Sequence, residues 1–468
     1  SLIIPANTLA SGGFAVDNSL RFNSGSSDYL TRTPSSATNK DLWSLSFWIK
    51  RSNLGSYQSI YGVYANSTNQ ETLAFDDSDR LYWQLYQSSA VKGQLTTNRV
   101  FRDVSAFYNI LIVYDSANGT AGNRMRMYIN GVEETSFATD TNPSSGQDSQ
   151  WNSTTAHTIG RINTTNYTNG YISELVAVDG TALSPTDVGE FDEDSGIWKP
   201  IDVSGLTFGT NGFYLDFENS GALGADVSGN TNNFTVNNLT AIDQTTDTPT
   251  LNFCTMNALD NFYQAATFSE GNCKYTTASS AYTYGTSTIG VSSGKWYTEV
   301  KITDGAGIEG DTHNTIGIVD TLTTAATGSG TNIIGNGANQ WGWHNDQQYT
   351  HNGSTTGSFG DSWHTGDILG QYVDLDNNKL YWSKNGTLQN TTGFALNGSV
   401  TFFFAVGDRH SGDTGTYDIN FGNPTYAISS GNTDDNGYGN FEYSPNITGD
   451  SVAKKFYALN TKNLSEFG

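Results

Sequence analysis

Residues 366–388 read GDILGQYVDLDNNKLYWSKNGTL and contain the clearest strand pattern of the chain. Apolar side chains recur at every second or fourth position, as the buried face of a β-strand requires. The positions expected on that face are Leu369, Val373, Leu375, Leu380 and Trp382. A polar turn over 376–379 separates the two strands, and Asn385-Gly386 turns the chain again. The stretch therefore predicts a β-hairpin.

A second hairpin is predicted in the other half of the chain. Residues 124–135 read RMRMYINGVEET, with Met125, Met127 and Ile129 on one face. The Asn130-Gly131 dipeptide that follows accepts the positive φ angles of a type I′ turn. The chain has 468 residues, and a single core usually stops growing at about 250–300 residues. Two β domains in series are therefore expected.

The composition indicates an all-β protein that does not bind nucleic acid. The chain has 51 Gly, 13% aromatic and only 15% charged residues, without a long stretch of helical periodicity. Its 22 Lys and Arg against 46 Asp and Glu give a net charge of −24. Scattered basic residues in so acidic a chain cannot neutralise a run of phosphates, so nucleic acid and anionic membranes are poor partners. No apolar run is long enough for membrane insertion.

Short strands separated by turn signals fill the first half and predict a two-sheet sandwich. One short helical turn is expected after them, with Ser184 as its cap and Pro185 at its first position. The ordered pieces SLRFNSGSSDYLTR, WSLSFWIKRS, RMRMYINGVEE, HTIGRI and NGYISELVAVDGTALSPTDV, within 14–195, resemble the laminin-G-like, concanavalin A-like jelly roll. This resemblance implies a lectin-like fold.

The second half resembles a different sandwich, the SPRY domain. The pieces that match in order, within 263–425, are GKWYTEVKI, NTIGIVD, WGWHNDQQYTHNG, GDILGQYVDLDNNKLYWSKNGT, VTFFFAVG and YDINFGNP. We therefore expect an N-terminal arm over 1–13, a laminin-G-like sandwich over 14–208, a connector over 209–262, a SPRY-like sandwich over 263–430 and a C-terminal tail over 431–468. The connector has one expected strand and either completes the first sandwich or bridges the two, with a hinge expected at 245–249.

The whole arrangement resembles virion structural proteins of tailed, marine-type bacteriophages that join these two modules. The resemblance includes the opening SLIIPANTLASGG and the closing ALNTKNLSEFG. It implies a particle component made in the bacterial cytoplasm, and the opening lacks the basic start and apolar core of a secretory signal. Expected partners are other virion proteins, a bacterial surface glycan or receptor, and further copies of the chain. A homotrimer is the oligomer that the resemblance to virion proteins suggests.

A catalytic role is not expected. Retaining glycosidases need two carboxyl groups about 5–5.5 Å apart, which sandwich glucanases supply in an ExDxxE pattern. The nearest match, EFDEDS at 190–195, lacks the final Glu and follows a helical turn. No GxSxG elbow, HExxH helix or P-loop is present. The sequence therefore predicts a protein that is not an enzyme.

Calcium is the cofactor that the loops could hold. Oxygen-bearing side chains flank Gly229 in a polar loop, and Ca²⁺ is bound by such oxygens. The candidate ligands are Asp216, Asp226, Asn230 and Asn232. Asn and Asp also dominate ordinary turns, so a purely structural loop is the alternative.

Aromatic and amide side chains in the second half form a candidate glycan site. Rings can stack on a sugar face while amides and carboxylates bind its hydroxyl groups. The candidates are Trp341, Trp343, Tyr349, Asn345 and Asp346. The alternative is that Trp341 and Trp343, two positions apart, are core residues of one strand.

The leading prediction is a non-enzymatic phage structural protein, a tail fibre, appendage or surface knob that binds a host-surface glycan or protein. An architectural protein of the capsid or a connector that binds only virion proteins is the first alternative, and a glycan-degrading enzyme is the second. The two cysteines, Cys254 and Cys273, either form one disulfide or remain separate buried thiols.

Overall fold

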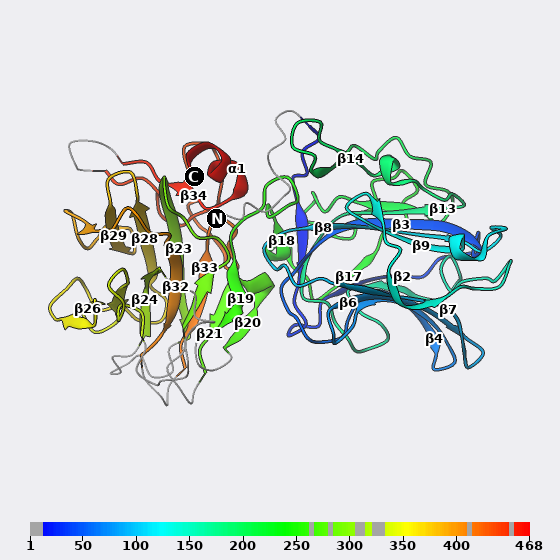
Figure 1. The fold of residues 1–468 in the computed structure, drawn as a ribbon, viewed down its shortest axis with the longest axis horizontal. Coiled ribbons are helices and arrows are strands. Elements are labelled where there is room, and N and C mark those ends of the chain that lie inside the picture. The colour runs from blue at the N-terminus through cyan, green and yellow to red at the C-terminus, as the bar shows by residue number, and fades with distance from the viewer. Residues whose placement is uncertain are drawn as a thin grey trace. The chain divides into compact units, whose positions relative to one another are not determined.

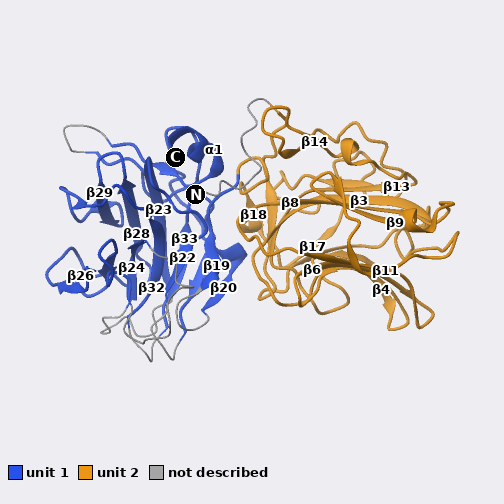
Figure 2. Cartoon of the chain, in the orientation of Figure 1, with its two compact units in different colours: residues 1–5, 252–468 blue, residues 6–251 orange. Residues whose placement is uncertain are grey.

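The computed structural model describes residues 13–261, 266–278, 284–304, 314–320, 333–409, 414–448 and 454–468. The expected N-terminal arm, apart from Gly13, lies outside these residues. Figure 2 shows two compact units that meet in the sequence between Leu251 and Asn252. The described part of the chain consists of antiparallel strands with short helical turns and one α-helix, so the predicted all-β class with two sandwiches is confirmed.

Residues 13–251, which belong to unit 2 of Figure 2, form the first sandwich, with two eight-stranded antiparallel sheets (Figure 1). One sheet runs in the order β10 (Val132–Glu133), β9 (Met125–Ile129), β8 (Tyr108–Asp115), β3 (Leu42–Arg51), β13 (Gly170–Asp179), β1 (Ser19–Phe22) and β18 (Gln244–Thr245), with β16 (Phe213–Leu215) paired to β13. The other runs in the order β11 (Phe137–Thr141), β7 (Ala90–Val100), β6 (Arg80–Gln87), β5 (Asn69–Phe75), β4 (Gln58–Asn66), β12 (His157–Ile159), β2 (Tyr29–Arg32) and β17 (Thr235–Asn237). Outside both sheets lie the hairpin of β14 (Gly189–Phe191) and β15 (Trp198–Pro200) and the 3₁₀ turns η1 (Ala121–Asn123), η2 (Pro185–Asp187) and η3 (Ala241–Asp243).

Alternation of side chains places one face of each sheet in a shared core. Met125, Met127 and Ile129 of β9 are buried there, as predicted. The predicted turn follows them, with positive φ angles of 48° at Asn130 and 76° at Gly131. The helical turn η2 also lies where the sequence predicted it, capped by Ser184 with Pro185 in first position.

The predicted connector supplies strands to the first sandwich. β16 pairs with β13, β17 with β2, and β18 with β1. The hinge expected at 245–249 lies within this unit, and Asp247 in it has no exposed surface. Its carboxylate Oδ2 lies 2.9 Å from the Lys50 Nζ. β18 and this buried ion pair place residues 244–247 in the first sandwich, where the sequence had predicted the start of a hinge.

The rest of the chain, from Asn252 on, belongs to unit 1 of Figure 2 and forms the second sandwich, again of two sheets. One runs in the order β19 (Met256–Asn261), β22 (Tyr284–Ser287), β32 (Phe403–Asp408), β24 (Asn314–Val319), β25 (Trp341–His344), β26 (Gln348–His351) and β27 (Ser354–Thr356). The other runs in the order β20 (Thr267–Ser269), β21 (Lys274–Thr276), β33 (Thr416–Asn420), β23 (Lys295–Asp304), β28 (Ile368–Asp374), β29 (Lys379–Lys384) and β30 (Thr387–Leu388). In this second sheet, β31 (Phe394–Ala395) also pairs with β29, and β34 (Tyr457–Ala458) pairs in parallel with β23. The 3₁₀ turn η4 (Glu270–Asn272) and the helix α1 (Thr461–Phe467) lie outside the sheets.

The hairpin over 366–388 forms as the sequence predicted. β28 and β29 pair in register from Asp374 with Lys379 to Leu369 with Lys384, and the five apolar positions named for it are buried in the core. The C-terminal residues return to this sandwich through β34 and α1. Cys254 and Cys273 are separate buried thiols. The described helices include none with the length and apolar character needed to cross a membrane.

Candidate functional site

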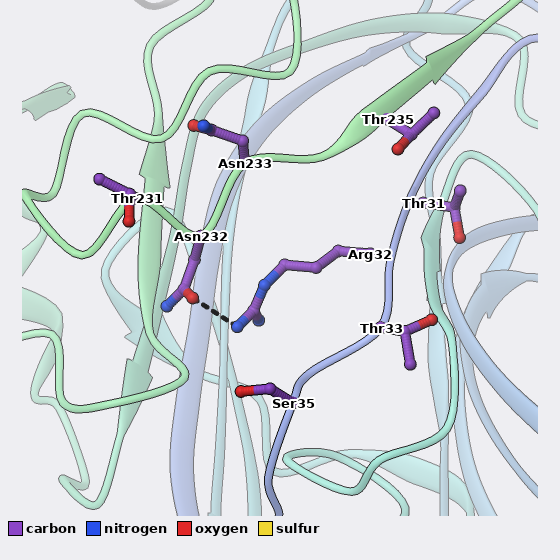
Figure 3. Close-up of a pocket in the computed structure, with 8 residues that line it drawn as sticks. All are labelled: Thr31, Arg32, Thr33, Ser35, Thr231, Asn232, Asn233 and Thr235. Atoms are coloured by element: carbon purple, nitrogen blue, oxygen red, sulfur yellow. Dashed lines mark hydrogen bonds between the residues drawn. The ribbon is translucent and has the colours of Figure 1, made fainter.

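A polar pocket of about 430 Å³ opens at one edge of the first sandwich, where β2 ends and β17 begins (Figure 3). Every residue that lines it is polar: Thr31, Arg32, Thr33, Ser35, Thr231, Asn232, Asn233 and Thr235. Thr33, Ser35 and Thr235 are exposed. In the described part of the chain their hydroxyl groups make no hydrogen bond, so all three are available to a ligand.

Strand pairing sets the positions of these side chains. Leu30 of β2 is buried in the core, so its neighbours Tyr29 and Thr31 point to the opposite face of the sheet. Thr235 pairs with Thr31, and Asn237 pairs with Tyr29. The edge strand β17 therefore places the hydroxyl group of Thr235 beside the hydroxyl group of Thr31 at the mouth of the pocket.

The loop on the other side of the pocket is shaped by Asp226. Its carboxylate accepts hydrogen bonds from the backbone N–H groups of Tyr214, at 2.9 Å, and Asn232, at 2.7 Å. The Asn232 amide in turn donates to the carbonyl oxygens of Thr210, at 2.9 Å, and Gly212, at 2.7 Å. These bonds hold the loop in one conformation before any ligand binds.

Arg32 extends into the pocket toward this loop (Figure 3). Its guanidinium donates to Asn232 Oδ1 at 2.5 Å and to the Asn211 side-chain and backbone oxygens at 3.2 and 3.3 Å. Burial lowers the pKa of Arg32, and the nearby carboxylates of Asp226 and Asp179 oppose that shift. Three of its five N–H groups are used within the described residues, which leaves two donors for a ligand.

All four side chains of the predicted calcium site take part in hydrogen bonds within the first sandwich. Asp226 and Asn232 bind backbone groups and Arg32, as described above. Asn230 donates its amide to the carbonyl oxygens of Gly209 and Gly212, and Asp216 accepts from the Glu218 N–H. In the described part of the chain no three His, Cys, Asp or Glu residues are grouped as metal ligands. These hydrogen bonds organise the loop, and the calcium site with its four ligands stays a prediction.

The predicted aromatic glycan site lies in the second sandwich, largely within its core. Trp343 has no exposed surface and packs against Trp363 and Trp382. Trp341 is 8% exposed and is stacked by His351, with ring centroids 3.5 Å apart. These rings are not free to stack on a sugar, which corrects the prediction for both tryptophans.

The remaining residues of that prediction have other contacts. Asn345 is buried, and the Asp346 carboxylate forms an ion pair with Arg409 at 2.6 Å. Tyr349 is half-buried and packs on Phe359 and Phe394, with centroids 5.3 and 4.8 Å away. The five residues are neighbours along β25 and β26, but they do not form an open binding surface.

The carboxylates of Glu190 and Asp192 lie at the end of the hairpin of β14 and β15. Both accept from the Lys199 ammonium, at 3.2 and 3.3 Å. Hydrogen bonds from Ser195 lower the pKa of Asp192 to about 2. A general acid of a glycosidase requires the opposite shift.

Sequence reasoning did not find the Arg32 pocket. Its two sides come from residues 31–35 and 231–235, which only the pairing of β17 with β2 brings together. The available signal was weak: an arginine at the end of a strand, followed by Thr33 and Ser35, in a strongly acidic chain.

Comparison with known proteins agrees with this description of the first sandwich. Residues 24–189 match the concanavalin A-like lectin/glucanases superfamily. This match supports the concanavalin A-like, laminin G composition predicted for the first sandwich. The match includes β2, Arg32 and the pocket residues up to Ser35, whereas β17 lies beyond it. A search of curated proteins found no match.

Solved structures with similarity to the chain include the SPRY domain of human HERC1 and a native heptameric SAP-like pentraxin from Limulus polyphemus. The SPRY domain is 18% identical with a TM-score of 0.28, and the alignment covers 35% of this chain and 96% of that domain. The pentraxin is 16% identical with a TM-score of 0.27, and the alignment covers 36% of this chain and 79% of that chain.

Proposed function

We propose that the first sandwich binds a glycan in the Arg32 pocket. The observation that supports this most directly is the set of unused hydrogen-bonding groups there: the hydroxyls of Thr33, Ser35 and Thr235 and two N–H groups of Arg32. Sugar hydroxyls both donate and accept hydrogen bonds, and threonine and serine hydroxyls can do the same. The volume of about 430 Å³ is within the range of about 300–1,000 Å³ that small-ligand sites occupy.

We further propose that the binding is not followed by catalysis. The pocket is lined by hydroxyls, amides and one guanidinium, and none of its lining residues is a carboxylic acid. The nearby Asp226 directs its oxygens to backbone N–H groups of the loop. Glu190 and Asp192, the candidates for a glucanase pair, share Lys199 as an ion-pair partner. Without a proton donor at the sugar, the site retains its ligand instead of cleaving it.

In biological terms we propose a structural protein of a bacteriophage particle that attaches to a glycan or receptor on the host surface. The support is the resemblance of the whole sequence, from its opening arm to its closing residues, to phage proteins that join these two modules. Several copies on one particle would raise the avidity of a weak site. Antibodies against the chain should detect it in purified particles of the phage that encodes it.

An architectural role is the second candidate, and one surface feature favours it. Val132 and Phe191 are 55% and 51% exposed. Phe191 packs on the Trp198 ring at 4.9 Å, and that ring also contacts Gly131, next to Val132. A small apolar patch of this kind suits contact with another protein. In that case no glycan would bind, and the chain would associate only with virion proteins.

The deciding experiment is a glycan array followed by calorimetric titration with the full chain. A Thr33→Val/Thr235→Val variant should weaken binding by about 5- to 150-fold, because each of the two lost hydrogen bonds contributes about 0.5–1.5 kcal/mol. Thr141→Val is the matched control, since Thr141 is exposed on β11, the opposite edge strand of the same sheet. Binding should persist with a calcium chelator present. Absence of binding to any glycan, or equal effects of both variants, would refute the proposal.

A further inference from the structure

The pocket continues along β2 onto a platform of two tyrosines and an arginine. Tyr29 lies two residues before Thr31 on the same outward face, which is about 6.6 Å along a strand. The Arg161 guanidinium covers the Tyr29 ring at 3.4 Å from its centroid. It also donates to the Tyr167 hydroxyl at 3.1 Å. Tyr29, Arg161 and Tyr167 are all half-buried, so each retains surface that a ligand could contact.

The loop that presents Arg161 is fixed to the sheet beneath it. Thr168 donates through its backbone N–H to Gly160 O and through its hydroxyl to Ser59 O, both at 2.8 Å. The backbone oxygen of Arg161 lies so close to Gly62 that a Cβ there would approach it to 2.9 Å. The guanidinium is therefore placed before a ligand arrives, which lowers the entropy cost of binding.

No carboxylate among the described residues neutralises the charge of Arg161. Five arginines of the same sandwich form ion pairs with carboxylates, whereas Arg32, Arg124, Arg126 and Arg161 form none among the described residues. Arg161 forms none among the described residues, although the chain has a net charge of −24. Its Nε is buried without a partner, whereas the outer nitrogens stay beside the two tyrosine rings. An unpaired, pre-positioned guanidinium binds a planar or tetrahedral anion well.

We propose that this platform binds a sugar residue with a carboxylate or sulfate group, adjoining the residue held in the Arg32 pocket. The surface that Tyr29 and Tyr167 leave uncovered contacts the sugar, Arg161 pairs with the anionic group, and Asn237, opposite Tyr29 on β17, offers an amide to its hydroxyls. Arg32 has a different role, because Asp179 and Asp226 lie near it; it donates hydrogen bonds to an uncharged part of the ligand. This inference rests on the proposed glycan-binding function and specifies the ligand as an acidic polysaccharide.

The test uses two pairs of probes that differ only in charge. Polygalacturonate oligosaccharides are compared with the same oligosaccharides as methyl esters, and dextran sulfate is compared with dextran. The anionic member of at least one pair should bind about tenfold more tightly to the full chain at low salt, and the difference should shrink as salt is raised. The pair that shows the difference identifies the anion as carboxylate or sulfate.

Variants assign the effect to Arg161. Arg161→Gln should abolish the charge preference, whereas Arg161→Lys should retain part of it, because the lysine keeps the charge and loses the planar fork. Arg124→Gln is the control, since Arg124 precedes β9 in the other sheet and also forms no ion pair among the described residues. Thermal unfolding curves that match wild type would exclude a loss of fold.

The outcomes separate this inference from the proposed function. Equal binding of charged and neutral probes, or an Arg161→Gln variant that keeps the preference, would overturn the platform while leaving glycan binding in the pocket intact. If no glycan binds the wild-type chain at all, both proposals fail.

Discussion

Asp247→Asn should destabilise the first sandwich strongly, because it removes the buried carboxylate that forms an ion pair with the Lys50 ammonium. Lys50 and Asp247 are 1% and 0% exposed, and their charged atoms lie 2.9 Å apart. Lys50 also lies near the rings of Phe107 and Tyr171, at 5.9 and 5.5 Å from their centroids. Neither ring can replace the carboxylate as a partner for a desolvated charge.

The expected loss follows from the burial of the pair. Removing one partner of a fully buried ion pair costs about 3–5 kcal/mol. For a sandwich of this size each kcal/mol lowers the unfolding temperature by about 2–4 °C, so a decrease of about 6–20 °C is expected. A Lys50→Met/Asp247→Leu double variant should recover most of the loss, because apolar side chains of similar volume carry no desolvation cost.

Hydrogen-exchange mass spectrometry can measure this in the full chain, since peptides from β3 and β13 report on the first sandwich separately from those of the second. Asp148→Asn is the matched control, because the ion pair of Asp148 with Lys40 is exposed to solvent. Their side chains are 55% and 31% exposed, respectively, so the loss of this pair should lower the free energy of unfolding by less than about 1 kcal/mol. The reasoning would be refuted if Asp247→Asn cost no more than this control, or if the double variant were less stable than the single one.

Three further predictions concern other buried groups. Burial raises the pKa of Glu174 to about 8, so its stabilising contribution is complete below about pH 4.5 and is lost as the pH rises through about 8; Glu174→Gln should remove this loss, up to about 4 kcal/mol, in urea unfolding at pH 5 and pH 9. Trp343→Ala should cost the second sandwich about 3–5 kcal/mol and leave glycan titrations unchanged, and weakened glycan binding by a folded variant would contradict the placement of the site. The Glu299 carboxylate accepts the backbone N–H groups of Glu442 and Tyr443 at 3.0 and 2.7 Å. Glu299→Leu should therefore speed hydrogen exchange over 441–443 with little change in β28. If residues 441–443 were equally protected in the wild type and in Glu299→Leu, those two hydrogen bonds would not stabilise this segment.

The strands were predictable wherever the pattern is local. The 366–388 hairpin combines two-residue alternation with turn residues that accept positive φ, such as Asn385 at 48° and Gly386 at 78°, and no distant contact is needed to read it. Trp341 and Trp343 show the limit of this reasoning. Alternation placed them on one face of one strand, but whether that face meets solvent or another sheet depends on residues far away, such as Trp382.

The candidate site was not predictable for the same reason. Arg32 and Asn232, which form a hydrogen bond, are 200 positions apart in the sequence. The polar loop is rich in oxygen atoms that could bind either a cation or backbone N–H groups, and Asp226 accepts hydrogen bonds from three such N–H groups. Composition cannot distinguish the two uses, because both need the same side chains.

The sequence by itself determined the all-β class, the presence of two sandwiches and the acidic character of the chain, because alternation, turn chemistry and charge are properties of short segments. Only the tertiary structure decided that residues 235–237 and 244–245 close the first sandwich, that Asp247 is buried against Lys50, and that the Arg161 guanidinium lies over the Tyr29 ring. Those features depend on strand order across a sheet, which joins residues that the sequence keeps far apart.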